Sequence, residues 1–388
     1  MDSHDKQVIQ LQSRMVPGAK HLAICLCGGG ATGAAYEVGA LAALEQEVPG
    51  FSANQFGTYI GTSAGALIAT ALACGVPVQR LLHAATTGDR FFAPSRSDIY
   101  RVDVRETAWK VGRVASGLFR LLRAVSRNPR ETLAQSALVD FASALPDGLF
   151  SLQHYIDWID RWLQQNGLPR YFDGVGPRLL ITANDLDTGH REVFGRGWRV
   201  NARIAEAIGA SSAVPLFFAP VRIGQHDYCD GGTGRVAHVD LAAGASHVLI
   251  INPVVPWNLE RRKRDLQADD ADILADSLTR IRARGMIGIW NQSFRMSNNV
   301  KLHMSLRRFR ADRPEVAMAL LEPDERDETL FVTNPMNTQA RARIAQHAFA
   351  TTVARIRQGD PALVAVCQGL SDAHRLDGLK RPSGHLGG

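Results

Sequence analysis

The sequence predicts an α/β protein of three layers, with helices on both faces of a mostly parallel central sheet. Compact apolar runs of strand length alternate with longer segments of helical periodicity along most of the 388-residue chain. This is the order that a parallel sheet with crossover helices requires. The first two apolar runs each end in a glycine-containing turn that leads into a helix, and the 45% apolar content suffices for a large core.

The individual elements follow from these patterns in chain order. A strand is expected where a short apolar or β-branched run stops at glycine, proline or a polar turn. The expected strands are His21–Cys27, Phe56–Ile60, Arg178–Asn184, His190–Phe194, His247–Asn252 and Val316–Leu321. Helices are expected where apolar residues recur at helical spacing. The expected helices are Ala34–Glu47, Ala64–Cys74, Leu149–Leu163, Asn201–Gly209 and Thr338–Gln358, with a charged surface helix across Asp265–Asp276 and Arg280–Arg284.

We expect one domain over residues 21–360, with a basic helical cap inserted at about 96–170. A charged tail, residues 1–20, precedes the domain and has no apolar run, so no secretory signal is expected. Residues 371–388 are rich in glycine and polar side chains, which predicts a disordered tail. The uncharged stretch Phe51–Gln79 could resemble a membrane span, but its regularly placed glycines favour a strand, a turn and a helix instead.

The net charge of +6 is concentrated in one segment. Between residues 96 and 130 the chain has nine Arg or Lys against three acidic residues, which indicates an anionic partner such as a membrane surface. Within it, Arg101–Arg127 has helical periodicity. It can be an ordinary helix packed on the domain, or a lid or membrane-docking helix.

Cysteine usage indicates reduced thiols. The five cysteines are an odd number without a CxxC pair, and Cys25 and Cys27 lie inside an expected core strand. This pattern is typical of a cytosolic protein without a disulfide framework or a zinc site.

A glycine-rich turn, Gly28–Gly33, follows the first expected strand and precedes a helix. Its spacing satisfies the Gly-x-Gly-x-x-Gly fingerprint of dinucleotide-binding proteins, but no acid ends a second strand about 20 residues later. A phosphate-binding P-loop is excluded because no Gly-Lys-Ser/Thr sequence follows. The free N–H groups of such a turn can also hold an oxyanion.

The second glycine-containing turn holds a serine. Ser63 lies in Gly61-Thr62-Ser63-Ala64-Gly65, between an expected strand and an expected helix. This is the context of a nucleophile elbow, in which small neighbours permit a cramped turn and the hydroxyl lies at the positive end of the helix. A simple helix N-cap is the alternative interpretation of the same serine.

An aspartate turn, Asp230-Gly231-Gly232, follows a further strand. Open α/β sheets place their sites at the carboxyl ends of strands, so this turn, Ser63 and the Gly28–Gly33 turn are expected to meet there. Acyl transfer needs a nucleophile, a base and a site for the oxyanion. Ser63, Asp230 and the backbone of Gly28–Gly30 would supply one each, although Asp230 alone is also a common kind of turn residue.

These three motifs, in this order, resemble those of the patatin-like phospholipases, and the resemblance extends from about residue 21 to 252. It implies a patatin-like fold and a lipid acyl hydrolase with Ser63 and Asp230 as its catalytic pair and an oxyanion hole in the first turn. The implied site residues are Ser63 and Asp230, the oxyanion-hole residues Gly28, Gly29 and Gly30, and the motif residues Gly33, Gly61, Gly65, Gly231 and Gly232. Thr32 departs from many bacterial members, in which a basic residue stands there.

The expected activity is hydrolysis of acyl esters of phospholipid or lysophospholipid through an acyl-enzyme, without a cofactor or a metal. Lipid is the expected partner, with membrane contact through Arg101–Arg127 and no nucleic acid. The expected location is cytoplasmic, with peripheral association with the membrane, and the oligomeric state stays open.

Two alternatives remain. One is a conventional Ser-Asp-His α/β-hydrolase, for which chain order offers four histidines after the acid: His238, His247, His303 and His347. The other is a non-catalytic protein that binds lipid or nucleotide through the same turns.

Overall fold

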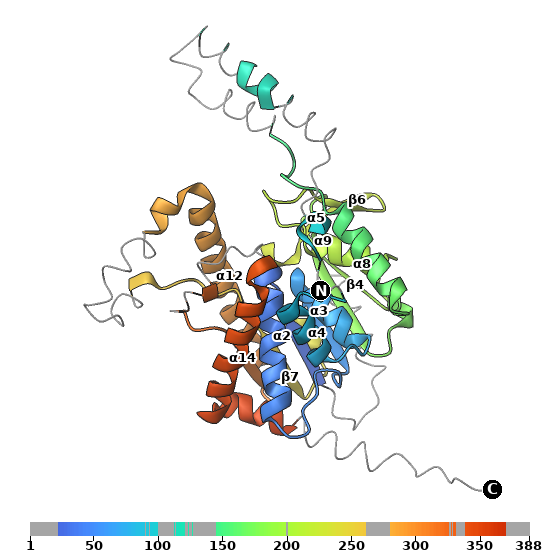
Figure 1. Cartoon of the computed structure of the whole chain (residues 1–388), viewed down its shortest axis with the longest axis vertical. Coiled ribbons are helices and arrows are strands. Elements are labelled where there is room, and N and C mark those ends of the chain that lie inside the picture. Colours follow the sequence, from blue (N-terminus) through green and yellow to red (C-terminus); the bar gives the residue numbers. More distant parts are fainter. Residues whose placement is uncertain are drawn as a thin grey trace, which may run out of the picture.

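The computed structural model of the chain (Figure 1) is built on one mixed sheet of eight strands. It describes residues 22–89, 91–92, 94–99, 112, 114–120, 123, 126, 145–198, 201–260, 280–325, 327, 329–330 and 338–369. The strands are β1 (Leu22–Leu26), β2 (Thr58–Thr62), β3 (Arg178–Asp185), β4 (Arg191–Gly195), β5 (Val221–Ile223), β6 (His226–Asp230), β7 (His247–Ile251) and β8 (Ala317–Leu321).

The sheet has the order β5-β6-β3-β2-β1-β7-β8, and β4 pairs with β3 off this path. Strands β3, β2, β1, β7 and β8 are mutually parallel. The antiparallel strands β4, β6 and β5 extend the sheet beyond β3. The predicted α/β class with a mostly parallel sheet is therefore confirmed.

Helices cover both faces of this sheet. The described helices are α2 (Gly30–Glu47), α3 (Ala64–Ala73), α4 (Val78–Thr87), α5 (Arg96–Ile99), α8 (Gln153–Gln165), α9 (Ile204–Ser211), α12 (Gly285–Asp312) and α14 (Arg341–Arg357). Short 3-10 turns are η1 (Phe172–Gly174), η2 (Gly231–Thr233), η3 (Val239–Ala242), η5 (Ile281–Arg284) and η6 (Thr338–Ala340). Among the described residues, no helix is long and apolar enough to cross a bilayer.

The alternation of side chains along the strands divides the core into two parts. In β1, Leu22, Ile24 and Leu26 point into the larger apolar cluster, which α2, α3, α4, α8, α9 and α14 cover. The residues between them, Ala23 and Cys25, point into the smaller cluster under α12 and η3. Such a continuously apolar strand is what a parallel sheet buried on both faces requires.

One glycine explains how closely two covering helices pack. A Cβ at Gly39 of α2 would lie 2.2 Å from the carbonyl oxygen of Ala345 in α14. Only glycine allows this approach, which brings α14 onto α2 (Figure 1).

The predicted elements agree with the structure except at several places. Helix α2 begins at Gly30, before the expected start, and α8 begins at Gln153. The domain continues past residue 360, because residues 361–369 form a further helix with buried Leu363 and Val366. Helix α8, assigned to the cap, contributes Ile159 and Leu163 to the main core.

Other predictions fall on undescribed parts of the chain. The tails 1–20 and 371–388, the acidic stretch Asp265–Asp276 and most of Arg101–Arg127 lie outside the described residues. In the described turn of that basic segment, residues 114–120, Leu118 and Phe119 are exposed, by 45% and 66%.

Candidate active site

The register of the sheet brings the three sequence motifs together. Leu26 of β1 pairs with Gly61 of β2, so the turns that follow these two strands are neighbours. Thr62 pairs with Thr182 of β3, and the next residue, Ala183, pairs with Asp230. Asp230 therefore lies at the level of Ser63, with the end of β3 between their strands.

The sequence did not predict the direction of the strand that carries Asp230. Strand β6 is antiparallel to β3, so Asp230 does not end a strand of the parallel set. It lies beside the turn after β2 because β6 pairs only with the last three residues of β3, Ala183–Asp185.

Ser63 occupies the strained turn between β2 and α3. Its backbone has φ 55° and ψ −133°, a left-handed conformation that is uncommon for residues other than glycine. A Cβ at Gly61 would lie 2.4 Å from the Cα of Ala66, and one at Gly65 would lie 2.5 Å from the carbonyl oxygen of Leu26. The two glycines of the motif are thus needed for close packing around the serine.

A second serine holds this turn in place. The N–H of Ser63 donates to the hydroxyl of Ser211 at 2.8 Å, and that hydroxyl donates to the carbonyl of Thr182 at 2.6 Å. Ser211 ends α9 and is fully buried. The sequence analysis gave Ser211 no role.

Asp230 is a buried carboxyl with one bonded and one open oxygen. Its exposed fraction is 3%, and Oδ1 accepts the N–H of Gly232 at 2.6 Å. Oδ2 has no well-formed hydrogen bond from any described residue. Burial raises the pKa of Asp230 to about 6, although the nearby Ser63 hydroxyl and the Gly232 N–H oppose the rise. The carboxyl is thus poised to titrate near neutral pH.

Asn184 of β3 fixes the backbone of the aspartate turn. Its Nδ2 donates to the carbonyl of Asp230 at 2.7 Å and to the hydroxyl of Thr233 at 2.8 Å. A Cβ at Gly231 would lie 2.4 Å from the carbonyl oxygen of Thr182. Glycine at this position therefore permits the close approach of the turn to β3.

The glycine-rich turn after β1 packs directly against Ser63. Gly28, Gly29 and Gly30 all have positive φ, at 79°, 107° and 69°. A Cβ at Gly28 would lie 2.4 Å from the carbonyl oxygen of Thr62 and 2.8 Å from the Cβ of Ser63. The turn then continues into α2, whose first N–H groups have no partner within the helix.

One predicted oxyanion donor must be corrected. The N–H of Gly28 donates to Oε1 of Glu37 at 2.8 Å, so it is not available to a substrate. No bond from the N–H of Gly29 or Gly30 to another described residue occurs beside it. The turn therefore offers two free donors, not three.

Glu37 itself lies about two turns into α2 and is fully buried. Burial raises the pKa of Glu37 well above its ordinary value, while backbone N–H groups of the glycine-rich turn oppose the rise. Burial thus favours the neutral form of this carboxyl, which holds the turn through the N–H of Gly28. The sequence gave no sign of this role, because Glu37 resembles any surface acid of a helix.

An apolar cavity opens beside Ser63. Its volume is about 100 Å³. Small and aliphatic side chains of α2, α3 and α4 line one part of it, including Ala34, Leu67 and Leu81, and Val214 and Phe218 line another. Arg341 is the one charged residue among the described residues of the lining, and the otherwise apolar wall suits a lipid acyl chain better than a dinucleotide.

The four candidate histidines lie elsewhere. The Nδ1 of His238 lies 3.1 Å from Arg191, and His247 bonds Ser246. Of the other two, His303 lies 4.0 Å from Glu322, and His347 lies 2.6 Å from Asp327. Within the described part of the chain, no histidine bonds Ser63 or Asp230.

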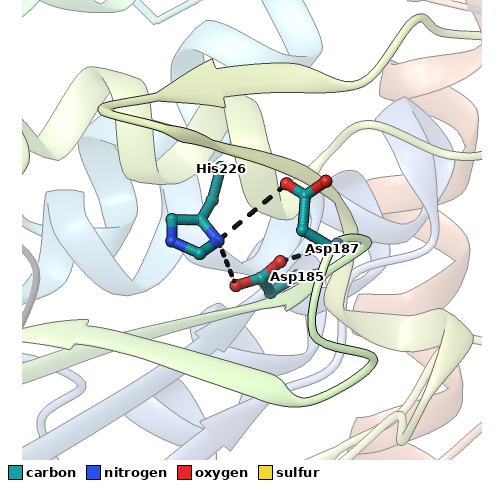
Figure 2. Close-up of side chains that lie close together, drawn as sticks. All are labelled: Asp185, Asp187 and His226. Atoms are coloured by element: carbon teal, nitrogen blue, oxygen red, sulfur yellow. Dashed lines mark hydrogen bonds and ion pairs between the residues drawn. The ribbon is translucent and has the colours of Figure 1, made fainter.

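One group of possible metal ligands occurs among the described residues, Asp185, Asp187 and His226 (Figure 2). The Nδ1 of His226 lies 3.0 Å from Asp185 and 3.9 Å from Asp187. The carboxylates also accept backbone N–H groups, Asp185 from residues 187 and 188 and Asp187 from Asp227. These bonds indicate a structural role for the three residues, which link the β3–β4 turn to β6.

A family model of patatin-like phospholipases matches residues 24–243, a span that contains all three turns. The chain belongs to this family. It is similar to a probable lipid hydrolase, 463L, of invertebrate iridescent virus 6, with 19% identity over 229 residues, which is 58% of this chain and 64% of the viral protein. The chain thus spans less than two thirds of that relative. Among solved structures it is similar to VipD from Legionella pneumophila, with a TM-score of 0.33 and 15% identity over 92% of this chain and 68% of VipD.

Proposed function

We propose that this protein is a serine lipid acyl hydrolase of the phospholipase A or lysophospholipase type. The observation that carries the proposal is that Ser63 and Gly30 line an apolar cavity, with Gly29 and the buried carboxyl of Asp230 close to Ser63. Membership of the patatin-like phospholipase family and similarity to a probable lipid hydrolase support it.

In the proposed reaction, the acyl chain occupies the cavity and places its ester carbon at Ser63. Asp230 accepts the proton of the Ser63 hydroxyl through Oδ2 as Oγ attacks the carbonyl. The N–H groups of Gly29 and Gly30 bind the resulting oxyanion, and the loss of one such donor typically costs about 10²–10³ in rate.

The second half of the reaction reuses the same groups. Asp230 returns the proton to the leaving alcohol, and the bond between the acyl carbon and that alcohol breaks to leave an acyl-enzyme. Water then gives its proton to Asp230, attacks the acyl carbon and releases the fatty acid while Ser63 recovers its proton. No step of this scheme requires a metal or a cofactor.

A Ser-Asp-His arrangement is less well supported, because the four candidate histidines lie beside other partners. A non-catalytic lipid-binding protein would need the cavity but not a strained serine beside a buried carboxyl with an open oxygen. These two features are the reason to favour catalysis.

The test is release of fatty acid from phosphatidylcholine and lysophosphatidylcholine, measured beside hydrolysis of a water-soluble butyrate ester. Wild-type protein should release acid from a lipid, and Ser63→Ala should not. Thr70→Ser, a change of similar size at a buried hydroxyl of the same helix, is the matched control and should stay active. A folded wild-type protein that cleaves neither kind of ester would contradict the proposal.

A further inference from the structure

Helix α12 has two apolar faces on opposite sides. Its inward face consists of Leu302, Leu306 and Phe309, which are buried in the smaller core cluster. The opposite face also consists of apolar side chains, and these are exposed to between 46% and 84%. They are Met286, Ile289, Met296, Val300 and Met304, which we call the outer stripe.

The outer stripe runs along one side of the helix and is interrupted there by Ser293. Its members recur at intervals of three, four or seven residues, so they share one side of the helix, and 18 residues at 1.5 Å each give a length of about 27 Å. A helix on the surface of a soluble monomer normally carries charged or polar side chains there. An exposed apolar row of this length indicates a surface that meets another apolar phase.

Helix α12 is fixed next to the candidate active site at two points. The Nζ of Lys301 donates to the carbonyl of Thr233 at 3.2 Å, just after the Asp230 turn. Nearer its N-terminus, the ring of Trp290 lies 5.6 Å from that of Phe217. The outer stripe is therefore rigidly placed relative to the site.

The aromatic contact also connects the helix to the wall of the cavity. Phe217 lies in the loop that lines the cavity with Val214 and Phe218. The same loop exposes Leu216 by 60% and holds it at φ 74°. An exposed leucine in a strained backbone conformation lowers stability, so its retention suggests a function. We infer that Leu216 extends the apolar surface from α12 toward the cavity.

The charge around the stripe identifies its partner. Residues 280–312 contain eight Arg or Lys, of which only Arg295 is buried, and a single acid, Asp312. Two copies of this helix face to face would bring like charges together, which opposes a symmetric dimer through the stripe. Arginines flanking an apolar helix face with a tryptophan at its side are instead suited to the headgroups of anionic lipids.

We propose that the outer stripe of α12 docks the protein onto an anionic lipid surface, beside the cavity that receives the acyl chain. The inference rests on the proposed function only in that the surface supplies the substrate. Met, Ile and Val of the stripe enter the boundary between headgroups and acyl chains, and the flanking arginines contact phosphates.

The test measures co-sedimentation of the full chain with vesicles of phosphatidylcholine mixed with phosphatidylserine, and with vesicles of phosphatidylcholine alone. All proteins carry Ser63→Ala, so that the lipid is not consumed. The variants Met296→Asp and Val300→Asp are each compared with Tyr171→Asp, a control whose side chain is exposed by 52% and lies after α8. Met296→Gln is a milder second change, and Arg120→Glu with Arg123→Glu tests the other basic segment.

The parent protein should bind the anionic vesicles and bind them less well in high salt. Each aspartate variant should bind about tenfold more weakly or worse, Met296→Gln should weaken binding by less, and Tyr171→Asp should not change it. Unchanged binding in both aspartate variants would overturn the proposal and, if Arg120→Glu with Arg123→Glu weakened it, would place docking on the other segment.

Two further outcomes separate this proposal from others. The docking proposal would be overturned if the parent protein did not bind vesicles and instead formed a dimer that Val300→Asp dissociates. The stripe would then be a contact between copies of the chain. Hydrolysis of the soluble butyrate ester by protein with Ser63 intact is measured separately. Its absence would refute the proposed function and not the docking surface.

Discussion

Replacing the buried carboxylate of Asp230 by an amide should stabilise the protein while it removes activity. The side chain is 3% exposed, and burial raises the pKa of Asp230 from 3.8 to about 6. Since one pKa unit is worth about 1.36 kcal/mol, the folded state loses about 3 kcal/mol by holding this group ionised at neutral pH. Asp230→Asn keeps an oxygen for the N–H of Gly232 and avoids this loss.

The sign of the pH dependence is fixed by the direction of the pKa change. A carboxyl whose pKa is raised in the folded state favours folding below the unfolded pKa, near 3.8, and loses that advantage as pH rises through about 6. The amide variant should therefore gain about 3 kcal/mol over wild type at pH 8 and about half of that at pH 5. For 388 residues, 3 kcal/mol corresponds to about 4 °C in Tm.

The assay is urea unfolding followed by circular dichroism at both pH values. Asp173→Asn is the control, because Asp173 has 89% of its side chain exposed and should show little gain at either pH. Equal stability of Asp230→Asn and wild type at pH 8 would refute the reasoning. A gain that is the same at pH 5 and pH 8 would also refute it, because the ionised group would then not be the cause.

Three further predictions concern rate and specificity. Because Asp230 must be ionised to act as base, kcat/KM for a butyrate ester should rise with pH through about 6, and a profile flat from pH 5 to pH 8 would contradict this. Glu37→Gln should keep most activity because its amide oxygen can still accept the Gly28 N–H. Glu37→Ala should lower the free energy of unfolding by about 1–3 kcal/mol and reduce kcat. Equal kcat values in the two variants would show that this bond does not position the turn. Ala34→Phe should fill part of the cavity, so the ratio of kcat/KM for long-chain over butyrate esters should fall, and an unchanged ratio would place the acyl chain elsewhere.

The parts of the site with local sequence signals were predictable. Gly61 and Gly65 stand on either side of Ser63 because the turn leaves no space for a Cβ, and this requirement is visible as a motif. Strand β1, before the first glycine turn, is a continuous apolar run because it is buried on both faces.

The parts that depend on tertiary packing were not predictable. Glu37 and Ser211 acquire their roles only when α2 and α9 pack against the turns. No local sequence pattern predicts either role. Strand β5 has three residues and no apolar run of its own.

Helix α12 was missed for a different physical reason. With apolar residues on two opposite sides, it lacks the one-sided periodicity by which a surface helix is identified. The second apolar side of α12, which obscures the helical pattern in the sequence, is also the surface that we propose for docking.

The most direct test of the catalytic pair is labelling with a fluorophosphonate probe, followed by mass mapping of the adduct in wild type, Ser63→Ala and Asp230→Asn. The proposed chemistry predicts an adduct on Ser63, none in Ser63→Ala, and strongly slowed labelling in the folded Asp230→Asn protein. An adduct on another residue, or full-rate labelling of Ser63 without the Asp230 carboxylate, would contradict it.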